Sequence, residues 1–418
     1  MYPEGGSRPP RTAGDAPAQR PGLPGSERRL PSSLLVGKEP GAWIAAADRL
    51  GSAPTPTKVR PERQRRADDP TSGTAGGRAG ESVPLLYRSR NVLDVNPTEA
   101  LDLPMVDEDL QRLEPLLAGS VMTGESFLDD VTTHLIAAGG KRLRPALALV
   151  AATRGEHPAS EDDLLGGVAV ELVHLASLYH DDVIDEATVR RNVESVNSRY
   201  GNLVAIVAGD YLLSRSAAIA AALGTEIAGL LATTLGQLCY GQVVEVRSCF
   251  KTDRNEEDYF AAIAGKTAAL MSASCRIGAL TSGARREEVE AFTQFGRAFG
   301  MVFQLRDDVL DVVAEDGELG KPPGQDLAEG VYTLPVLLAL RDPDAGPELR
   351  TLLGQPLGQP EREKARSIVS ESRAVAGTVA IARLHLAQAI AAASGIAPRH
   401  VASGLERLAS SLLDDLPS

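Results

Sequence analysis

The sequence has few of the residues that favour β-sheets and few that form crosslinks. Only 4% of its 418 residues are aromatic, and Ala and Leu dominate instead. Strands favour aromatic and β-branched residues, whereas Ala and Leu are among the strongest helix formers. Cys239, Cys249 and Cys275 are isolated thiols whose spacing fits neither a zinc site nor a disulfide framework. These scarcities predict an all-α protein in a reducing compartment, and we expect the cytoplasm.

Long apolar runs are also missing. No run reaches the roughly 18 residues that suggest a membrane span, so we expect no stable membrane insertion. A secretory signal needs an apolar core after a charged start, and residues 1–29 offer Pro, Gly and Arg instead. The formal net charge of −13 divides into +6 in residues 1–90 and −19 in the remainder. An acidic body argues against nucleic acid as a partner.

Residues 1–90 differ from the rest of the chain in composition. They hold 13 of the 27 prolines, together with many Gly, Ser and Arg residues. Such a stretch cannot bury enough apolar surface to offset the entropy lost on ordering. We therefore expect a disordered Pro/Gly/Arg-rich tail over 1–90 and an all-α domain over 91–418.

Apolar residues recur at helical spacing from about residue 106 onward, and no strand pattern is evident. Gly and Pro mark a loop at Glu318–Gln325 and breaks between shorter helices near Pro343, Gly354–Pro360 and Gly395–Pro398. The longer predicted helices are Val106–Leu117, Glu125–Ala138, Leu143–Thr153, Leu164–Asp185, Leu203–Leu223, Glu226–Val246, Glu256–Thr281 and Arg286–Val313.

Two acidic boxes of the form D-D-x-x-D interrupt apolar stretches, one at 181–185 and the other at 307–311. On a helix, residues i and i+4 share a face, so each box would present two carboxylates together. A single box is more often a solvated helix face. Two boxes at apolar positions are costly unless cations neutralise them. Oxygen-only ligands favour Mg²⁺, which takes one or two carboxylates and completes its shell with water and phosphate. Facing boxes would thus hold a diphosphate through metal ions.

Basic residues lie close to both boxes. Any one of them alone is most often a solvated charge. Placed together, they suggest two separate diphosphate sites, one bound through metal and the other bound by Arg and Lys. The cations are Lys141, Arg142 and Arg144 at a helix start, Arg190 and Arg191 after the first box, Lys266 in an apolar helix, and Lys321 after the second box.

Seven motifs follow one another between residues 139 and 335, and the match that they carry covers about residues 105 to 415. They are G-G-K-R-L-R-P at 139–145, E-L-V-H-L-A-S-L-Y-H-D-D-V-I-D-E at 171–186, R-R at 190–191, G-Q-V-V-E at 241–245, G-K-T at 265–267, F-Q-L-R-D-D-V-L-D at 303–311 and G-K-P-P-G-Q-D-L-A-E-G-V-Y-T-L-P at 320–335. In this order they resemble the trans-prenyl diphosphate synthase (polyprenyl synthetase) family. The resemblance implies an isoprenoid-synthase-type bundle of long helices around a central cavity, commonly a homodimer. It also implies an Mg²⁺-dependent prenyltransferase that condenses isopentenyl diphosphate head-to-tail onto an allylic diphosphate, making an all-trans polyprenyl diphosphate.

The resemblance assigns roles by position. The isopentenyl diphosphate pocket is matched by Lys141, Arg144, His174 and Arg191. The Mg²⁺ ligands are matched by Asp181, Asp185, Asp307 and Asp311, and the catalytic set adds Asp182, Asp308 and Lys266. Contacts to the allylic diphosphate are matched by Arg190, Lys266, Thr267, Gln304 and Lys321. A histidine on an apolar helix is more often a core residue, so His174 rests on the motif match alone.

Three positions depart from the family pattern. Asn192 stands where Gly is usual, Tyr179 where an aliphatic residue is more common, and Arg306 where a smaller or neutral residue is common. None of them removes a predicted ligand. Arg306 is placed to pair with Asp307 or with a phosphate.

Product length is predicted from the helix face below Asp181. One turn rises about 5.4 Å, roughly one isoprene unit. The family's short-chain enzymes tend to place a bulky residue at Ala176 or Ser177, and neither is bulky here. We expect an open tunnel and a product of roughly 30 carbons or more, of the quinone side-chain type, with a farnesyl or geranylgeranyl length as the alternative. Tyr179 should project to another face, and the tunnel floor is expected from Leu203–Leu223.

Three other functions fit parts of the pattern, and one of them, a structural cation-binding bundle, would not explain the cationic sites. A terpene cyclase keeps one D-D-x-x-D box, but its second metal motif mixes Asn, Ser and Glu, and it needs no second diphosphate pocket. A non-catalytic subunit of a heteromeric synthase should have lost acidic boxes. This chain keeps both boxes and the G-G-K-R-L-R-P segment, which favours the synthase.

Overall fold

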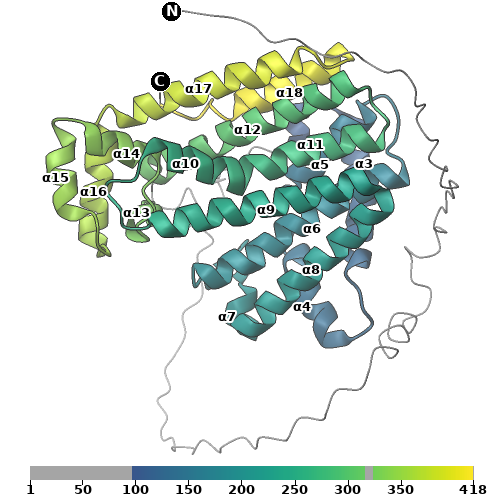
Figure 1. The fold of residues 1–418 in the computed structure, drawn as a ribbon, viewed down its shortest axis with the longest axis horizontal. Coiled ribbons are helices and arrows are strands. Elements are labelled where there is room, and N and C mark those ends of the chain that lie inside the picture. The colour runs from purple at the N-terminus through teal and green to yellow at the C-terminus, as the bar shows by residue number, and fades with distance from the viewer. Residues whose placement is uncertain (1–96, 316–322, 418) are drawn as a thin grey trace, which may run out of the picture. The chain divides into compact units, whose positions relative to one another are not determined.

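The computed structural model describes residues 97–315 and 323–417, all within one compact unit, Lys58–Ser418. The tail predicted over 1–90 and the predicted substrate contact Lys321 lie outside the described residues. The described part is a bundle of long helices (Figure 1), which confirms the predicted all-α class.

The first two thirds of the bundle contain its longest helices, and the predicted helices agree with them to within a few residues. One prediction needs correction, because Glu256–Thr281 is not one continuous α-helix but contains a π-helical turn, η2. The elements are α2 (Pro97–Leu101), α3 (Pro104–Ser120), α4 (Ser126–Ala137), α5 (Leu143–Thr153), α6 (Glu161–Ile184), β1 (Val189–Arg190), β2 (Val193–Glu194), α7 (Val196–Tyr200), α8 (Asn202–Leu223), α9 (Thr225–Ser248), α10 (Glu256–Ile263), η2 (Ala264–Ala268), α11 (Ala269–Thr281) and α12 (Arg286–Val313).

The remaining helices are shorter, apart from one that runs along α12. The breaks predicted near Pro343, Gly354–Pro360 and Gly395–Pro398 fall between them, as expected. They are α13 (Gln325–Ala328), α14 (Leu334–Arg341), α15 (Ala345–Leu352), α16 (Gln359–Glu371), α17 (Ala374–Ala393) and α18 (Arg399–Ser411). In Figure 1, α17 and α18 lie side by side along α12.

Helix α6 is the centre of the larger of two apolar clusters. It begins with a capping box in which Ser160 and Asp163 satisfy each other's backbone N–H groups. Helices α5 and α11 pack so closely beside it that a Cβ at Gly278 would lie 1.9 Å from the carbonyl oxygen of Ala148. Only glycine fits there. The second cluster surrounds the C-terminal half of α12. Both acidic boxes therefore sit on helices that are packed into the core.

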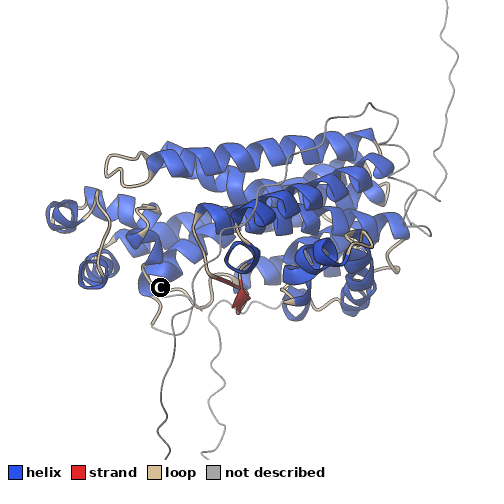
Figure 2. Cartoon of the chain, turned by 90° about the horizontal axis from the view of Figure 1, so that it is seen from below, coloured by secondary structure: helices blue, strands red, loops and turns tan. Residues whose placement is uncertain are grey.

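A short antiparallel hairpin, β1–β2, follows α6 (Figure 2), so the expectation of no strands is wrong at this point. Two residues per strand are too few to leave a period-2 pattern in the sequence. Arg191 and Asn192 form the turn with φ of 55° and 62°, the left-handed geometry that two-residue hairpin turns require. Asn192, noted above as a departure from Gly, tolerates this geometry.

Three described helices, α8, α9 and α17, are long and apolar enough to cross a membrane, judged by length and composition alone. Isolated polar residues, such as Ser214 and Arg215 in α8, interrupt each of these helices, so none of the three is an uninterrupted apolar run. Only 28–39% of their most apolar windows is buried within the bundle. Composition therefore gives no support to the expected absence of membrane spans, which stays a prediction.

Candidate active site

The first acidic box lies at the C-terminal end of α6, where Asp181 and Asp182 occupy the last turn and Asp185 is the C-cap. Asp182 is fully buried, and Nε and Nη2 of Arg190 lie 2.7 and 2.6 Å from its Oδ1. Burial raises the pKa of Asp181 to about 6, with Lys266 opposing the rise and Asp185 adding to it. A helix C-terminus already carries partial negative charge. The carboxylates gathered there therefore favour a bound cation.

The second acidic box lies near the end of α12. Asp308 and Asp311 are buried, while Asp307 is partly exposed. Asp308 accepts hydrogen bonds from the Tyr259 hydroxyl and, at 2.9 Å, from the Gln304 amide. Burial raises the pKa of Asp308 to about 8, although these two bonds oppose the rise. Asp308 thus anchors the box to α10, whereas Asp307 and Asp311 share the helix face that the sequence predicts for metal.

The π-helix η2 carries Lys266 and Thr267 next to both boxes. Thr267 donates a hydrogen bond of 2.7 Å to Gln304, which in turn binds the second box. Lys266 Nζ lies 2.5 Å from Glu245 Oε1 of α9 and attracts Asp181 of the first box. Burial alone would lower the pKa of Lys266, but nearby carboxylates, led by Glu245, raise it overall. The lysine is therefore a charged residue, and π-turns are frequent at functional sites.

Helix α9 crosses η2 in direct backbone contact at two glycines. A Cβ at Gly241 would lie 2.7 Å from both the Ala262 carbonyl oxygen and the Lys266 amide nitrogen. A Cβ at Gly265 would lie 2.5 Å from the carbonyl oxygen of Gln237. These distances are too short for any side chain. The close crossing brings the acidic end of α9 to the lysine.

The two boxes experience a common charge environment. Burial is the main cause that raises the pKa of Asp185 and of Asp308, and the Asp326 carboxylate adds to both. The Asp326 backbone N–H also donates to Asp311 at 3.3 Å.

No three His, Cys, Asp or Glu side chains of the described residues already converge on a metal position. Because Mg²⁺ needs only one or two carboxylates per ion, this oxygen-only set fits it. Asp182 Oδ2, buried without a hydrogen-bond partner among the described residues, fits a nearby cation as well.

A second, cationic group lies beside the hairpin. Arg144 of α5 and Arg191 of the hairpin turn attract the buried Glu171 of α6, and Arg191 Nη2 is 3.8 Å from its carboxylate. The same two arginines act on His174 of α6. Burial lowers the pKa of Arg144 to about 10, with Glu171 opposing the change and Arg191 adding to it. Burial and these arginines hold the pKa of His174 well below its ordinary value, so the ring is neutral. Arg144 Nε is buried without a hydrogen-bond partner among the described residues, and Lys141 is exposed nearby in sequence.

Sequence reasoning missed three side chains that shape these sites: Glu171, Glu245 and Tyr259. The first two stand inside the matched motifs, and an acidic residue on the apolar α6 three positions before His174 was an available signal. Tyr259 has no comparable signal. Arg142, grouped with the cations by its motif, instead pairs with two carboxylates, including Glu171 at 3.0 Å, and is almost fully buried.

The residues predicted to set chain length lie on α6 above a packed region. Ala176 is fully buried and Ser177 half-buried. Tyr179 is buried and donates a 2.7 Å hydrogen bond to the carbonyl oxygen of Val131 in α4. Farther down, Ser216 of α8 donates to the Ala169 carbonyl at 2.8 Å. Helix α8, the predicted source of the floor, therefore packs against α6 at that depth.

Three comparisons place these features among known proteins. A family model described as Polyprenyl synthetase matches residues 125–371. A nonaprenyl diphosphate synthase of Mycobacterium tuberculosis is 40% identical over 64% of this chain and 80% of that protein. A heptaprenyl diphosphate synthase component 2 of Geobacillus stearothermophilus is 36% identical over 73% of this chain and 93% of that protein.

One solved structure is similar to this chain in fold as well as in sequence. It is a geranylgeranyl pyrophosphate synthase from Corynebacterium glutamicum, complexed with calcium and isoprenyl diphosphate. It is 37% identical to this chain with a TM-score of 0.67, and the match covers 75% of this chain and 96% of that one. The likeness therefore extends over nearly the whole of that protein.

Proposed function

This chain belongs to the polyprenyl synthetase family, and on that premise we propose that it condenses isopentenyl diphosphate head-to-tail onto an allylic diphosphate. It is a transferase of prenyl groups, and the proposed product is an all-trans polyprenyl diphosphate of medium-to-long chain. One observation carries the reaction: the π-helix η2 connects to both acidic boxes, through Lys266 to the first and through Thr267 and Gln304 to the second, while a separate group of arginines lies beside Glu171. Two anion sites of different chemistry suit two diphosphate substrates. Relatives named for nonaprenyl and heptaprenyl products support the longer chain over the geranylgeranyl alternative.

We propose Mg²⁺ at the acidic boxes, held by Asp181, Asp185, Asp307 and Asp311. The calcium in the Corynebacterium relative supports a divalent cation site in this fold. When bound, Mg²⁺ neutralises the diphosphate that leaves the allylic carbon. The proposed direct contacts to that diphosphate are Arg190, Lys266, Thr267, Gln304 and Lys321.

The protein's own cations supply the remaining electrostatic stabilisation. Lys266 is fixed by Glu245 and already faces the first box, so its charge is oriented before substrate arrives. Arg144, His174 and Arg191, with Lys141, are proposed to hold isopentenyl diphosphate at the cationic group. The apolar face of α6 around Ala176 would keep water from the allylic cation. No side chain stands out as a base, so the departing diphosphate is the proposed proton acceptor.

The test is prenyl transfer by the purified chain alone. Incubation with an allylic diphosphate, labelled isopentenyl diphosphate and Mg²⁺ should give labelled polyprenyl products of about 30 carbons or more, by the estimate of one helical turn per unit. Excess chelator should stop turnover and leave the helical circular dichroism unchanged. Cyclic hydrocarbon without label incorporation would identify a terpene cyclase. Activity only after adding a second protein would identify a subunit of a heteromeric synthase.

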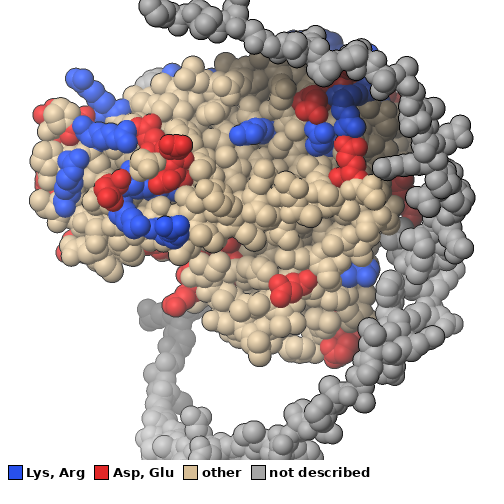
Figure 3. Space-filling model, in the orientation of Figure 1, with Lys and Arg blue, Asp and Glu red and all other residues tan. Residues whose placement is uncertain are grey.

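We also propose that the enzyme is a cytoplasmic homodimer. Figure 3 shows a broad surface over α8 and α9 with few charged side chains. Its exposed large apolar residues are Leu203 at 76%, Tyr240 at 63%, Val207 and Val243 at 54%, and Val246 at 51%. An apolar face of this kind favours a protein partner over water, and a second copy of the chain would bury it symmetrically.

Light scattering should show that the wild type is a dimer and that Tyr240→Lys dissociates it. Leu384→Lys changes an equally exposed apolar site on α17 and should leave the dimer intact. A monomeric wild type would contradict the proposal.

A further inference from the structure

A line of alternating charges runs from the surface of α3 to the hairpin turn. Glu114 of α3 accepts two hydrogen bonds from Arg142, the N-cap of α5, one from Nε at 2.6 Å and one from Nη2 at 3.1 Å. Arg142 Nη1 donates to Glu171 at 3.0 Å, and the same carboxylate oxygen lies 3.8 Å from Arg191 Nη2. The Glu114 side chain is 44% exposed, whereas that of Arg142 is almost fully buried. The line therefore connects the surface to the buried cationic group.

Arg142 has an unusual backbone conformation that its side-chain contacts support. Its φ of 48° and ψ of 34° are left-handed, which is unfavourable for most residues because Cβ crowds the following carbonyl oxygen. A buried guanidinium also needs counter-charges. Glu114 and Glu171 supply them, and the Ile136 carbonyl oxygen accepts a further bond at 3.2 Å. Two parallel charge-assisted bonds to one carboxylate fix the plane of the guanidinium. The turn that begins α5 thus depends on the pair with Glu114.

The residues just before Arg142 are held from their other side by Arg191. Arg191 Nη1 donates to the carbonyl oxygens of Leu135, at 3.1 Å, and Gly139. Its guanidinium packs on Gly140, where an added Cβ would lie 2.9 Å from Cζ. The start of the G-G-K-R-L-R-P segment is therefore held between two arginines, and both of them contact the same carboxylate.

We propose that Glu114 and Arg142 are positioning residues for isopentenyl diphosphate. The proposal rests on the proposed function, because it takes Lys141 and Arg144, on either side of Arg142, as contacts of that diphosphate. Arg142 directs its own donors to protein groups, so it acts through the turn that it anchors. When the pair with Glu114 is lost, Arg142 binds Glu171 more strongly and draws that carboxylate away from the cationic group.

The test removes the charge of Glu114 and measures the KM for isopentenyl diphosphate. Glu114→Gln keeps the size of the side chain, and the KM should rise about three- to tenfold, below the roughly 100-fold cost of a 1 Å misplacement. The kcat and the KM for the allylic diphosphate should stay unchanged. Glu108→Gln is the matched control, because Glu108 is an exposed carboxylate on the same helix. It removes the same long-range charge without breaking the pair, and should leave the KM unchanged.

A second variant separates geometry from charge. Arg142→Lys keeps the positive charge but cannot form the two parallel bonds to Glu114. It should therefore raise the KM for isopentenyl diphosphate as Glu114→Gln does. In the Arg142→Lys background, Glu114→Gln should have no further effect, because the two residues act as one pair.

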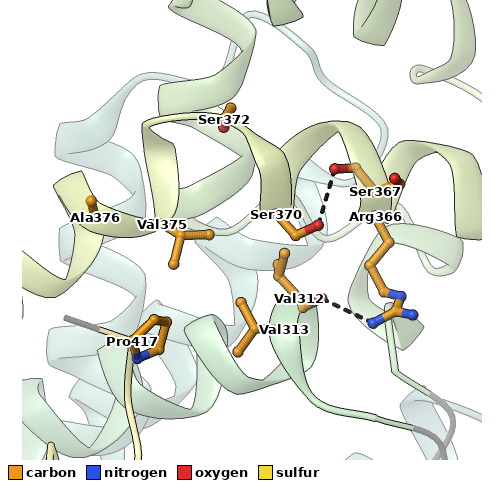
Figure 4. A pocket seen from close by; sticks show the side chains of 9 residues that line it. All are labelled: Val312, Val313, Arg366, Ser367, Ser370, Ser372, Val375, Ala376 and Pro417. Carbon is orange, nitrogen blue, oxygen red and sulfur yellow. Dashed lines mark hydrogen bonds between the residues drawn. The ribbon is translucent and has the colours of Figure 1, made fainter.

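An arginine at another helix end controls for a general loss of stability. In Figure 4, Arg366 of α16 donates to the Val312 carbonyl oxygen at the end of α12, at 3.1 Å, and it also donates to that of Ala314 at 3.0 Å. Arg142 makes the same kind of contact with Ile136 at the end of α4. Arg366→Gln should therefore lower the melting temperature and leave the KM for isopentenyl diphosphate unchanged.

The outcomes separate this proposal from the proposed function. No rise in KM for Glu114→Gln would overturn the positioning role, and so would an equal rise in Glu108→Gln or Arg366→Gln. A wild type that incorporates no isopentenyl diphosphate at any concentration would instead contradict the proposed function.

Discussion

Replacing Gly241 with alanine tests whether the crossing of α9 and η2 positions Lys266. The new methyl group would meet two backbone atoms at 2.7 Å, about 0.7 Å inside the closest ordinary contact, and backbone cannot rotate away as a side chain can. Overpacking of this kind costs about 1–3 kcal/mol. The helices must separate by several tenths of an ångström. Because Lys266 Nζ lies 2.5 Å from Glu245, that separation acts directly on the ion pair.

The matched control is Gly229→Ala on the same helix, where a Cβ meets nothing within 4 Å. There the substitution should stabilise by up to about 1 kcal/mol, since alanine is the better helix former. Thermal unfolding should place Gly241→Ala several degrees below the control, at roughly 2 °C per kcal/mol for a domain of this size. Its kcat/KM should fall about 10- to 100-fold, as small misplacements of a charged group do. Equal melting temperatures and full activity in both variants would refute the argument.

Three further outcomes follow from the same structure. The pKa of Asp308 is about 8 in the folded protein and about 3.9 in the unfolded chain, so the free energy of unfolding of wild type falls as pH rises from 4 to 8. In urea unfolding of the metal-free protein, the stability of Asp308→Asn relative to wild type should therefore increase over that pH range, and a constant difference would contradict the assignment. Ser177→Phe should shorten the product with condensation retained, and unchanged chain length on chromatography would count against the tunnel face. A chain beginning at Asn91 should fold and turn over normally, since no predicted site residue precedes it.

The sequence predicted the helices and the acidic boxes because both depend on local spacing. Apolar periodicity depends on residues three and four apart, and each D-D-x-x-D box can be recognised within five consecutive residues. The pairing of Asp182 with Arg190 is nearly local too, since a tight hairpin brings residues eight apart together. Features of this range can be derived without knowing the fold.

Contacts between distant segments could not be predicted in this way. Tyr259 and Asp308 are 49 residues apart, and only the packing of α10 against α12 brings them together. Arg306 was noticed as an unusual residue, but its partner Asp415 lies more than a hundred residues later, in a stretch with no motif. The position of the π-turn could not be predicted either, because one extra residue in a helical turn does not change the residue types of the segment.

The π-turn at Ala264–Ala268 fixes the angular phase between two halves of what would otherwise be one rod. Each residue of an α-helix advances the side-chain direction by about 100°, so an added residue rotates everything beyond it relative to everything before it. Before this turn Tyr259 points to Asp308, and within it Thr267 reaches Gln304. Deleting one residue here would restore a regular α-helix and change the direction of these side chains relative to one another without altering any of them. The spacing is thus as much a part of the site as the side chains.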